Sequence, residues 1–281
     1  MDDVKYIDLS NSKIAYKKLG SGEPLIMCTG YASTMDLWST ELIKKLQKNF
    51  TVILFDYRGM GYSKNMSGSF SINTLAEDVY MIMNALNISK TNVLGWSMGG
   101  FVAQMFAINH AEKINKLILY ATNCGGTDTI NPSEEISSIL SNPSSSPVEL
   151  LGTLFPDSWL STHNKPWEYL PKVEEPYNTE TVKLQYDAVQ DWLKPGGGST
   201  GLLHKLNIPA LIICGSEDKV VPYKNSLILS KLISSSILAV VEGTGHGLMY
   251  QLPEAFANYV INFLLSQIPS MELSKEETWS C

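Results

Sequence analysis

Short apolar runs recur along this chain, and stretches with helical periodicity separate them. The runs occupy residues 24–28, 51–55, 91–95, 114–121, 210–215 and 236–241. One intervening stretch places Ile72, Leu75, Val79 and Ile82 on a single helical face. A strand that is apolar throughout is buried on both faces, and parallel strands joined by helices achieve this. The alternation therefore predicts an α/β fold with a mostly parallel central sheet and flanking helices.

The alternation stops between residues 123 and 206. Serine, proline and glycine are frequent in this segment. Helical patterns occur at 133–140, 147–155 and 179–193, and the segment contains no strand-like run. Aromatic side chains such as Trp159 and Trp192 need a surface to pack on, which disfavours a flexible loop. We therefore predict a helical cap at 123–206, inserted into an α/β core of residues 1–122 and 207–281. Residues 268–281 are polar and without periodicity, so we expect a flexible tail there.

The composition disfavours several kinds of partner. A net charge of −7 over 281 residues offers no basic surface for nucleic acid. No apolar run approaches the roughly 18 residues that span a membrane. The polar, acidic start of the chain leads us to expect no secretory signal and a cytoplasmic protein.

The cysteines and the loops give no sign of a metal or a cofactor. The four cysteines lack metal-ligand spacing and are expected to be free thiols in a reducing compartment; they are Cys28, Cys124, Cys214 and Cys281. The sequence also has no phosphate-binding loop of the kind that cradles nucleotides. We therefore expect neither a metal nor a cofactor.

A G-x-S-x-G pattern connects one apolar run to a long helical stretch. Its defining residues are Gly95, Ser97 and Gly99. Glycines on both sides of the serine permit a sharp strand-to-helix turn that exposes the hydroxyl beside the helix N-terminus. Such a turn positions a weakly nucleophilic alcohol for covalent catalysis. The alternative is a glycine-rich turn with a solvated serine.

Two further chemical groups follow later apolar runs. Asp218 comes after the run at 210–215, and His246 comes after the run at 236–241. The carboxyl ends of parallel strands meet at one edge of the sheet, where ligands bind. Ser97, Asp218 and His246 are therefore predicted to lie at the same edge, in the chain order of a hydrolase triad.

Taken together, these motifs resemble those of a capped α/β hydrolase of the esterase, enol-lactonase and cofactor-free haloperoxidase kind. The resemblance covers nearly the whole chain and is carried by residues 56–63, 95–100, 215–222 and 243–247. It implies that Ser97 is the nucleophile, His246 the general base and then acid, and Asp218 the group that orients the imidazole. Glu217 is a neighbouring carboxylate, but the family's spacing from Gly215 to the acid falls on Asp218.

The same resemblance implies an oxyanion hole made of backbone N–H groups. One donor is expected from Met98, next to the nucleophile, and the second from Tyr31. Many relatives have His-Gly in the loop that carries the second donor, after the apolar run at 24–28, whereas this chain has Thr29 and Gly30. Because a backbone group is the donor, the departure does not by itself abolish the hole.

Other residues near the motifs are expected to bind substrate or to hold loops. Trp96, Leu248 and Trp159 are candidates for substrate contact, with core packing as the alternative for Trp96. Asp56 and Arg58 are expected to form an ion pair that fixes a loop rather than to take part in catalysis.

These observations favour a serine hydrolase that cleaves a small carboxylic ester or lactone through an acyl-serine intermediate. Serine at position 97 disfavours relatives that use a carboxylate nucleophile. A C–C bond hydrolase or a perhydrolase with the same triad is an alternative, as is a slow-turnover ligand-sensing protein. The expected partner is a small molecule, with no nucleic acid and no membrane, and the oligomeric state is left open.

Overall fold

A computed structural model of the chain describes residues 4–66, 68–142, 144–175 and 178–266. Its centre is one sheet with strand order β1-β2-β4-β3-β6-β7-β8-β9, to which β5 adds beside β2. The strands are β1 (Lys5–Leu9), β2 (Ser12–Leu19), β3 (Glu23–Cys28), β4 (Phe50–Phe55), β5 (Lys64–Asn65), β6 (Thr91–Trp96), β7 (Ile114–Tyr120), β8 (Ala210–Gly215) and β9 (Ser236–Val241). Neighbours from β4 to β9 are parallel, whereas β1, β2 and β5 pair antiparallel. The prediction of a mostly parallel central sheet is confirmed.

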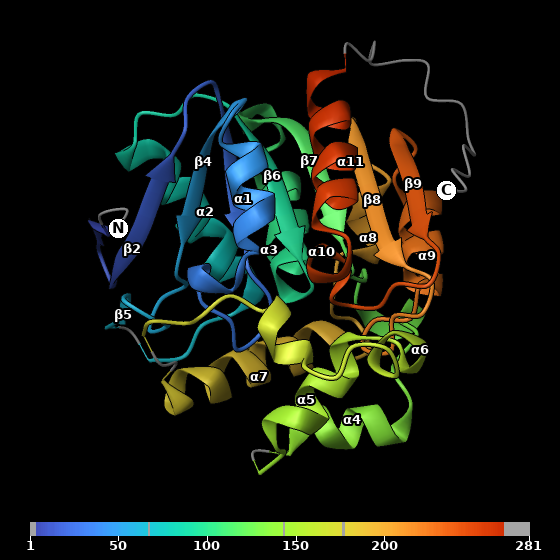
Figure 1. Ribbon diagram of the computed structural model, residues 1–281. Helices are drawn as coiled ribbons and strands as arrows, with labels where there is room; N and C mark the ends of the chain where they lie inside the picture. The colour runs from blue at the N-terminus through green and yellow to red at the C-terminus, as the bar shows by residue number, and fades with distance from the viewer. Residues whose placement is uncertain (1–3, 67, 143, 176–177, 267–281) are drawn as a thin grey trace.

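Helices surround the sheet and extend beyond one of its edges (Figure 1). They are α1 (Thr40–Leu46), α2 (Ile72–Ala85), α3 (Met98–Asn109), α4 (Glu134–Ser141), α5 (Pro147–Leu154), α6 (Asp157–Leu160), α7 (Thr179–Leu193), α8 (Thr200–Leu203), α9 (Lys224–Leu232), α10 (Leu248–Gln251) and α11 (Pro253–Leu265). Short 3-10 helices occupy Met35–Leu37, Ala111–Lys113, Gly126–Asp128 and Pro166–Tyr169.

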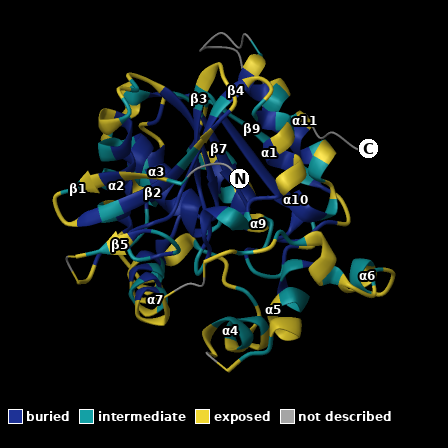
Figure 2. Cartoon of the chain, turned by 60° about the vertical axis from the view of Figure 1, so that its left-hand side comes forward, coloured by how far each residue is buried: buried dark blue, intermediate teal, exposed yellow. Residues whose placement is uncertain are grey.

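Side chains alternate along each central strand between two buried cores, one on each face of the sheet. On β3, Ile26 packs with α2 and α3, whereas Leu25 and Met27 pack with α1 and α11. Figure 2 shows this arrangement as dark, buried strands enclosed by helices whose outer faces are exposed. Because both faces of the sheet are apolar, the polar groups of the strand-to-helix connections lie at the ends of the strands.

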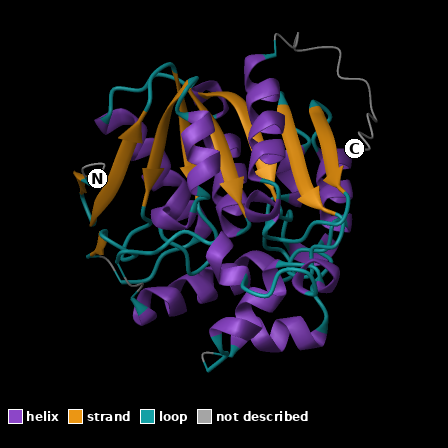
Figure 3. Ribbon diagram, viewed as in Figure 1, coloured by secondary structure: helices purple, strands orange, loops and turns teal. Residues whose placement is uncertain are grey.

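Of the α-helices in residues 123–206, α4 to α7 lie beyond the carboxyl ends of the parallel strands, as the arrowheads in Figure 3 show, whereas α8 packs beside α3. This segment is anchored in both cores: Trp192 of α7 packs with the α2–α3 side, and Phe155 after α5 packs with the α1–α11 side. The predicted helix at 179–193 has the bounds of α7. The short helices α6 and α8 lie outside the helical patterns expected from the sequence.

Three cysteines, Cys28, Cys124 and Cys214, are free and buried. Burial raises the pKa of the Cys28 thiol to about 12, so this thiol stays protonated and unreactive at neutral pH. Cys281 and the tail predicted at 268–281 lie outside the described residues. Within the described ranges, none of the helices has the length and apolarity needed to cross a membrane.

Lys116 of β7 closes the C-terminal end of α11. Its ammonium donates hydrogen bonds to the carbonyl oxygens of Phe263 at 2.8 Å, Leu264 at 2.9 Å and Ser266 at 2.5 Å. The last carbonyls of a helix have no intrahelical partner and carry partial negative charge. The lysine therefore supplies both the donors and the charge that this helix end needs.

We expect Lys116→Met to lower the free energy of unfolding by about 1 to 2 kcal/mol, because several carbonyls lose a charged donor. Urea denaturation followed by circular dichroism would measure the change. The matched control is Lys90→Met, since Lys90 is exposed. Equal stability of the two variants would contradict a role for Lys116 in holding α11.

Candidate active site

Ser97 is the single residue between β6 and α3, and its backbone has a conformation that L-residues rarely adopt. Its φ is 56° and its ψ is −121°, and α3 begins at the next residue. The turn is held by hydrogen bonds from the Ser97 N–H to the Tyr120 carbonyl at 2.9 Å and from the Thr122 hydroxyl to the Ser97 carbonyl at 2.8 Å. Strained backbone of this kind persists only where its surroundings enforce it, and it is concentrated at functional sites.

The glycines on both sides of Ser97 are required by close packing. A Cβ on Gly99 would collide with the carbonyl groups of Cys28 and Thr29 at the end of β3. A Cβ on Gly95 would collide with the backbone of Gly99 and Gly100. Ser97 itself remains partly exposed. The packing thus presses the helix N-terminus against the sheet and leaves the serine accessible.

Asp218 and His246 form a buried pair at the same edge of the sheet. The Nδ1 atom of His246 lies 2.8 Å from Oδ2 of Asp218, and their side chains are 4% and 0% exposed. The other carboxylate oxygen accepts the backbone N–H groups of Val220 and Val221 at 2.9 and 2.8 Å. Because a carboxylate only accepts, Nδ1 carries the proton of this bond and Nε2 is the ring nitrogen that can accept one. Glu217 is exposed, and its backbone N–H bonds to Thr244.

Aromatic residues enclose the His246 segment. The Tyr120 hydroxyl donates to the His246 carbonyl at 2.6 Å and accepts the Met249 N–H at 3.2 Å. The Trp96 ring centroid lies 5.7 Å from that of His246. Sequence analysis did not single out Tyr120, although a polar atom at the end of an apolar strand is the kind of signal that could have identified it.

The segment after β3 passes directly beside Ser97. The position of a Cβ on Gly30 would be 3.4 Å from the Ser97 Cβ. Tyr31 follows, partly exposed, and burial raises the pKa of its phenol, with smaller contributions from Tyr186 and Asp187. Met98 is the first residue of α3 and is 1% exposed. The two residues expected to donate to an oxyanion therefore belong to backbone segments that border the serine.

The inserted segment contacts three loops of this edge. The Gly247 N–H donates to the Leu154 carbonyl at 2.7 Å, next to His246. Lys219, next to Asp218, forms an ion pair with Asp157 at 2.6 Å. These contacts tie the loops that carry Asp218 and His246 to the region around α5 and α6.

The third contact comes from α7. The side-chain oxygen of Gln185 accepts the N–H of Ala32 at 2.9 Å. Gln185 was missed by sequence analysis, although it lies on the face of α7 that also carries Val182 and Val189.

The three residues expected to contact substrate lie in different surroundings. Trp96 is 5% exposed and packs among aromatic rings that include Trp38 and Tyr250. Leu248 is fully buried at the start of α10. Trp159 is partly exposed and stacks between Phe155 and His163 in the inserted segment. The ring contacts described for Trp159 are all with residues of that segment.

Asp56 and Arg58 do not pair with each other, which corrects the ion pair expected from the sequence. Arg58 Nε instead lies 2.7 Å from an oxygen of Asp78 on α2. Asp56 is fully buried and accepts the N–H groups of Met35 at 2.7 Å and Tyr62 at 2.9 Å. Burial raises the pKa of Asp56 to about 6, and the two backbone hydrogen bonds oppose part of that rise. Asp56 thus fixes two loops through their backbones.

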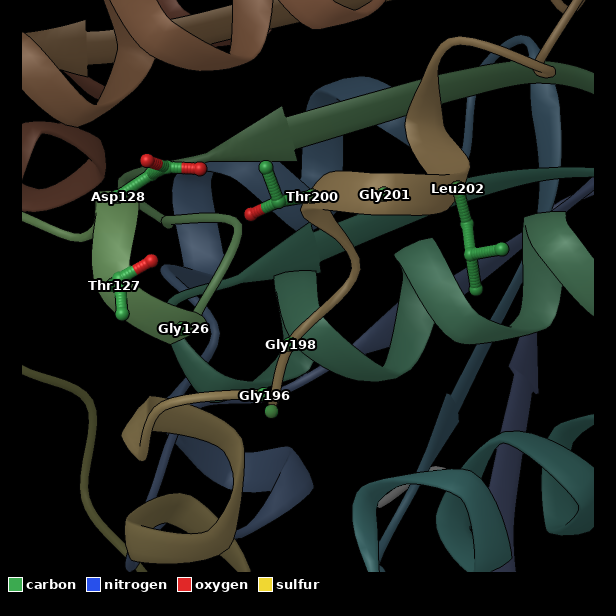
Figure 4. A pocket seen from close by; sticks show the side chains of 9 residues that line it. Gly126, Thr127, Asp128, Gly196, Gly198, Thr200, Gly201 and Leu202 are labelled. Carbon is green, nitrogen blue, oxygen red and sulfur yellow. The ribbon is translucent and has the colours of Figure 1, made fainter.

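A surface hollow of about 380 Å³ lies elsewhere, where two glycine-rich segments meet (Figure 4). Its lining includes Gly126, Asp128, Gly198 and Thr200, and it contains neither Ser97, Asp218 nor His246. With a single ionisable side chain, it lacks the paired groups that acid–base or nucleophilic chemistry requires. Among the described residues, no cluster of three or more His, Cys, Asp or Glu side chains could hold a metal ion.

Comparison with known proteins agrees with this architecture. The family model for the alpha/beta hydrolase fold matches residues 23–158. An enol-lactonase from Burkholderia xenovorans superposes with a TM-score of 0.78 at 20% identity, over 93% of this chain and 100% of that one. At this identity the likeness shows the fold. The chain therefore has the α/β-hydrolase fold that its motifs resemble, and the relatives and solved structures it is similar to include hydrolases.

Two relatives are similar over most of their length. The human protein named Serine hydrolase BPHL is 25% identical over 265 residues, which cover 92% of this chain and 85% of that protein. The 2-hydroxy-6-oxo-6-(2'-aminophenyl)hexa-2,4-dienoic acid hydrolase of Metapseudomonas resinovorans is also 25% identical, over 92% of this chain and 90% of the relative. Both names describe hydrolases.

We expect Asp56→Asn to destabilise the protein by about 1 to 3 kcal/mol, because an amide can accept one backbone N–H but turns its own NH₂ toward the other. The cost should depend on pH. The pKa of Asp56 is raised from 3.8 to about 6 in the folded state, so the folded protein holds this proton more tightly than the unfolded chain. Wild-type stability should therefore fall, relative to the variant, as pH rises from about 4 to about 6.

Urea denaturation of wild type and Asp56→Asn across that pH range would measure the gap between their unfolding free energies. A gap that widens with rising pH would mean that the pKa of Asp56 is depressed rather than raised, and would contradict this prediction.

Proposed function

We propose that the protein is a serine hydrolase that cleaves a small carboxylic ester or lactone through an acyl-serine intermediate. The observation that carries the proposal is the buried hydrogen bond between His246 and Asp218 at the edge where the strained turn presents Ser97. An oriented imidazole and a partly exposed serine at a helix N-terminus are parts that covalent acyl transfer requires. The human relative named as a serine hydrolase and the structurally similar enol-lactonase support the same reading.

In the proposed mechanism, Ser97 Oγ attacks the substrate carbonyl carbon while His246 Nε2 takes the hydroxyl proton. The carbonyl oxygen gains negative charge and accepts the N–H groups of Met98 and Tyr31. Collapse of this intermediate breaks the bond to the leaving oxygen, which takes the proton from His246. A water molecule then attacks the acyl-serine carbonyl and gives a proton to His246. The bond to Ser97 Oγ breaks, the carboxylic acid leaves, and His246 returns the proton to Ser97. Asp218 holds the imidazole and stabilises its cationic form.

In this proposal, the cap predicted at 123–206 holds the loops around the site and lines the substrate pocket. Its contacts with Gly247, Lys219 and Ala32 hold the loops that carry the base, the acid and the second oxyanion donor. Its aromatic residues, including Trp159, favour a small substrate with apolar or aromatic character.

The dienoic acid hydrolase relative favours a second candidate, hydrolysis of a C–C bond by the same three residues. Perhydrolysis uses the same groups with peroxide in place of water. A panel of activated esters, lactones and vinylogous diketones distinguishes these reactions, since each releases a different product.

Treatment with a fluorophosphonate should add one phosphonyl group to the wild-type protein and none to Ser97→Ala, measured as intact mass. The reason is that the reagent reports an activated serine rather than an accessible one. A folded wild-type protein that forms no adduct would contradict the proposal and would favour the slow-turnover ligand-sensing alternative.

Asp218→Asn should lower kcat for a short activated ester on the order of a thousandfold, because the amide no longer fixes the tautomer and charge of His246. The matched control is Glu217→Gln, which removes the adjacent exposed carboxylate and should keep kcat within about twofold. A comparable loss in both variants would overturn the assignment of Asp218.

A further inference from the structure

Gln185 of α7 reaches the segment that runs beside Ser97. Its side chain is fully buried, and its Oε1 accepts the Ala32 N–H at 2.9 Å. The opposite orientation of the amide would set its NH₂ against that N–H, so the backbone donor fixes which atom is which. Nε2 therefore faces away from this bond. Within the part of the chain that the structure describes, Nε2 has no hydrogen-bond partner.

Other buried polar atoms without a partner gather around the same segment. Among the described residues there are eight such side-chain atoms, on Ser12, Thr29, Thr34, Trp38, Asn92, Trp96, Thr129 and Gln185. Five of these residues surround the segment after β3. Thr29, Thr34 and Trp38 belong to residues 29–39, Trp96 immediately precedes Ser97, and Gln185 is hydrogen-bonded to Ala32. All five can donate, and the indole and amide nitrogens only donate. An unpaired buried donor is unfavourable, so an acceptor atom brought by a ligand would stabilise this group of donors.

Gln185 is hydrogen-bonded to the segment that passes beside Ser97. Ala32 is two residues from Gly30, which lies against Ser97, and adjacent to Tyr31. The Trp96 indole, by contrast, is enclosed by the rings of Trp38, Tyr120 and Tyr250. The threonine hydroxyls can rotate toward a neighbour, whereas the Gln185 amide is held by its own bond to Ala32.

We propose that Gln185 is a specificity-determining residue whose Nε2 donates to a second oxygen atom of the substrate, beyond the carbonyl that Ser97 attacks. The preferred substrate is then an ester or lactone that carries a further carbonyl, carboxylate or hydroxyl oxygen. This inference rests on the proposed ester or lactone hydrolysis and names its substrate class. A site built to bind such an oxygen rejects an analogue that lacks it, because the donor is then left unpaired.

A matched pair of substrates tests this assignment. Ethyl 4-oxopentanoate has the extra carbonyl, and ethyl pentanoate has the same chain without it. We expect wild-type kcat/KM to favour the oxo ester by about tenfold or more. Gln185→Met keeps the length of the side chain without its donor, and it should reduce that ratio to about one. Gln190→Met alters an exposed glutamine on the same helix and should leave the ratio unchanged.

A second variant separates donation to substrate from the hold on Ala32. Gln185→Glu retains an oxygen for the Ala32 N–H but loses the N–H donor when assayed at about pH 8. It should also lose the preference for the oxo ester, which a role confined to holding the loop would leave intact. Circular dichroism melting establishes that each variant is folded.

A binding measurement makes the result independent of turnover and of any change at position 185. Calorimetry with Ser97→Ala should give a dissociation constant for ethyl 4-oxopentanoate that is about tenfold smaller than that for ethyl pentanoate. Equal hydrolysis and equal binding of the two esters would overturn the inference while the proposed function stands. If folded wild-type protein hydrolyses neither ester nor any activated ester, the proposed function fails and the inference fails with it.

Discussion

The close approach of α3 to the end of β3 is the constraint on which the site depends. Gly99 lies against the carbonyl groups of Cys28 and Thr29, with no space for a side chain. This contact brings the first turn of α3 beside the segment that carries Gly30 and Tyr31. A larger residue at position 99 would push the helix N-terminus away from that segment. The serine at the turn and the backbone N–H groups proposed as oxyanion donors would then separate, even if each strand stayed in place.

Burial of the sheet on both faces explains why polar chemistry gathers at its edge. A carboxylate such as Asp218 can be fully buried only when its charge is compensated. Two backbone N–H groups and the His246 ring provide that compensation. The same bonds that make burial tolerable also orient the imidazole, so the structural need of the acid and the chemistry proposed for it coincide.

The sequence predicted the parallel strands and the longer helices such as α2 and α7 because their signals are local. Apolar runs and helical spacing depend on near neighbours in the chain, and α7 occurs with the bounds predicted for it. Pairing between side chains was less accessible, since it depends on which segments meet in space. Arg58 pairs with Asp78 rather than Asp56 because α2 passes close to the loop after β4. The three candidate catalytic residues could be named from motifs and chain order. Gln185 could not, because its significance comes from a contact with Ala32, 153 positions away.

Gln185 lies in a different part of the fold from the three residues proposed to react. Ser97, Asp218 and His246 all belong to connections of the sheet, whose geometry is set by the two buried cores. Gln185 belongs to α7, which lies in the inserted segment and is anchored through Trp192 and Ala188. A change in the face or register of α7 would therefore alter the donor presented to a substrate without moving the groups proposed to react. Because a helix shifts as a unit, one small change of packing at Trp192 would move the Gln185 amide relative to Ala32. On this view, the reaction depends on the packing of the sheet, and the choice of substrate depends on how α7 is seated against it.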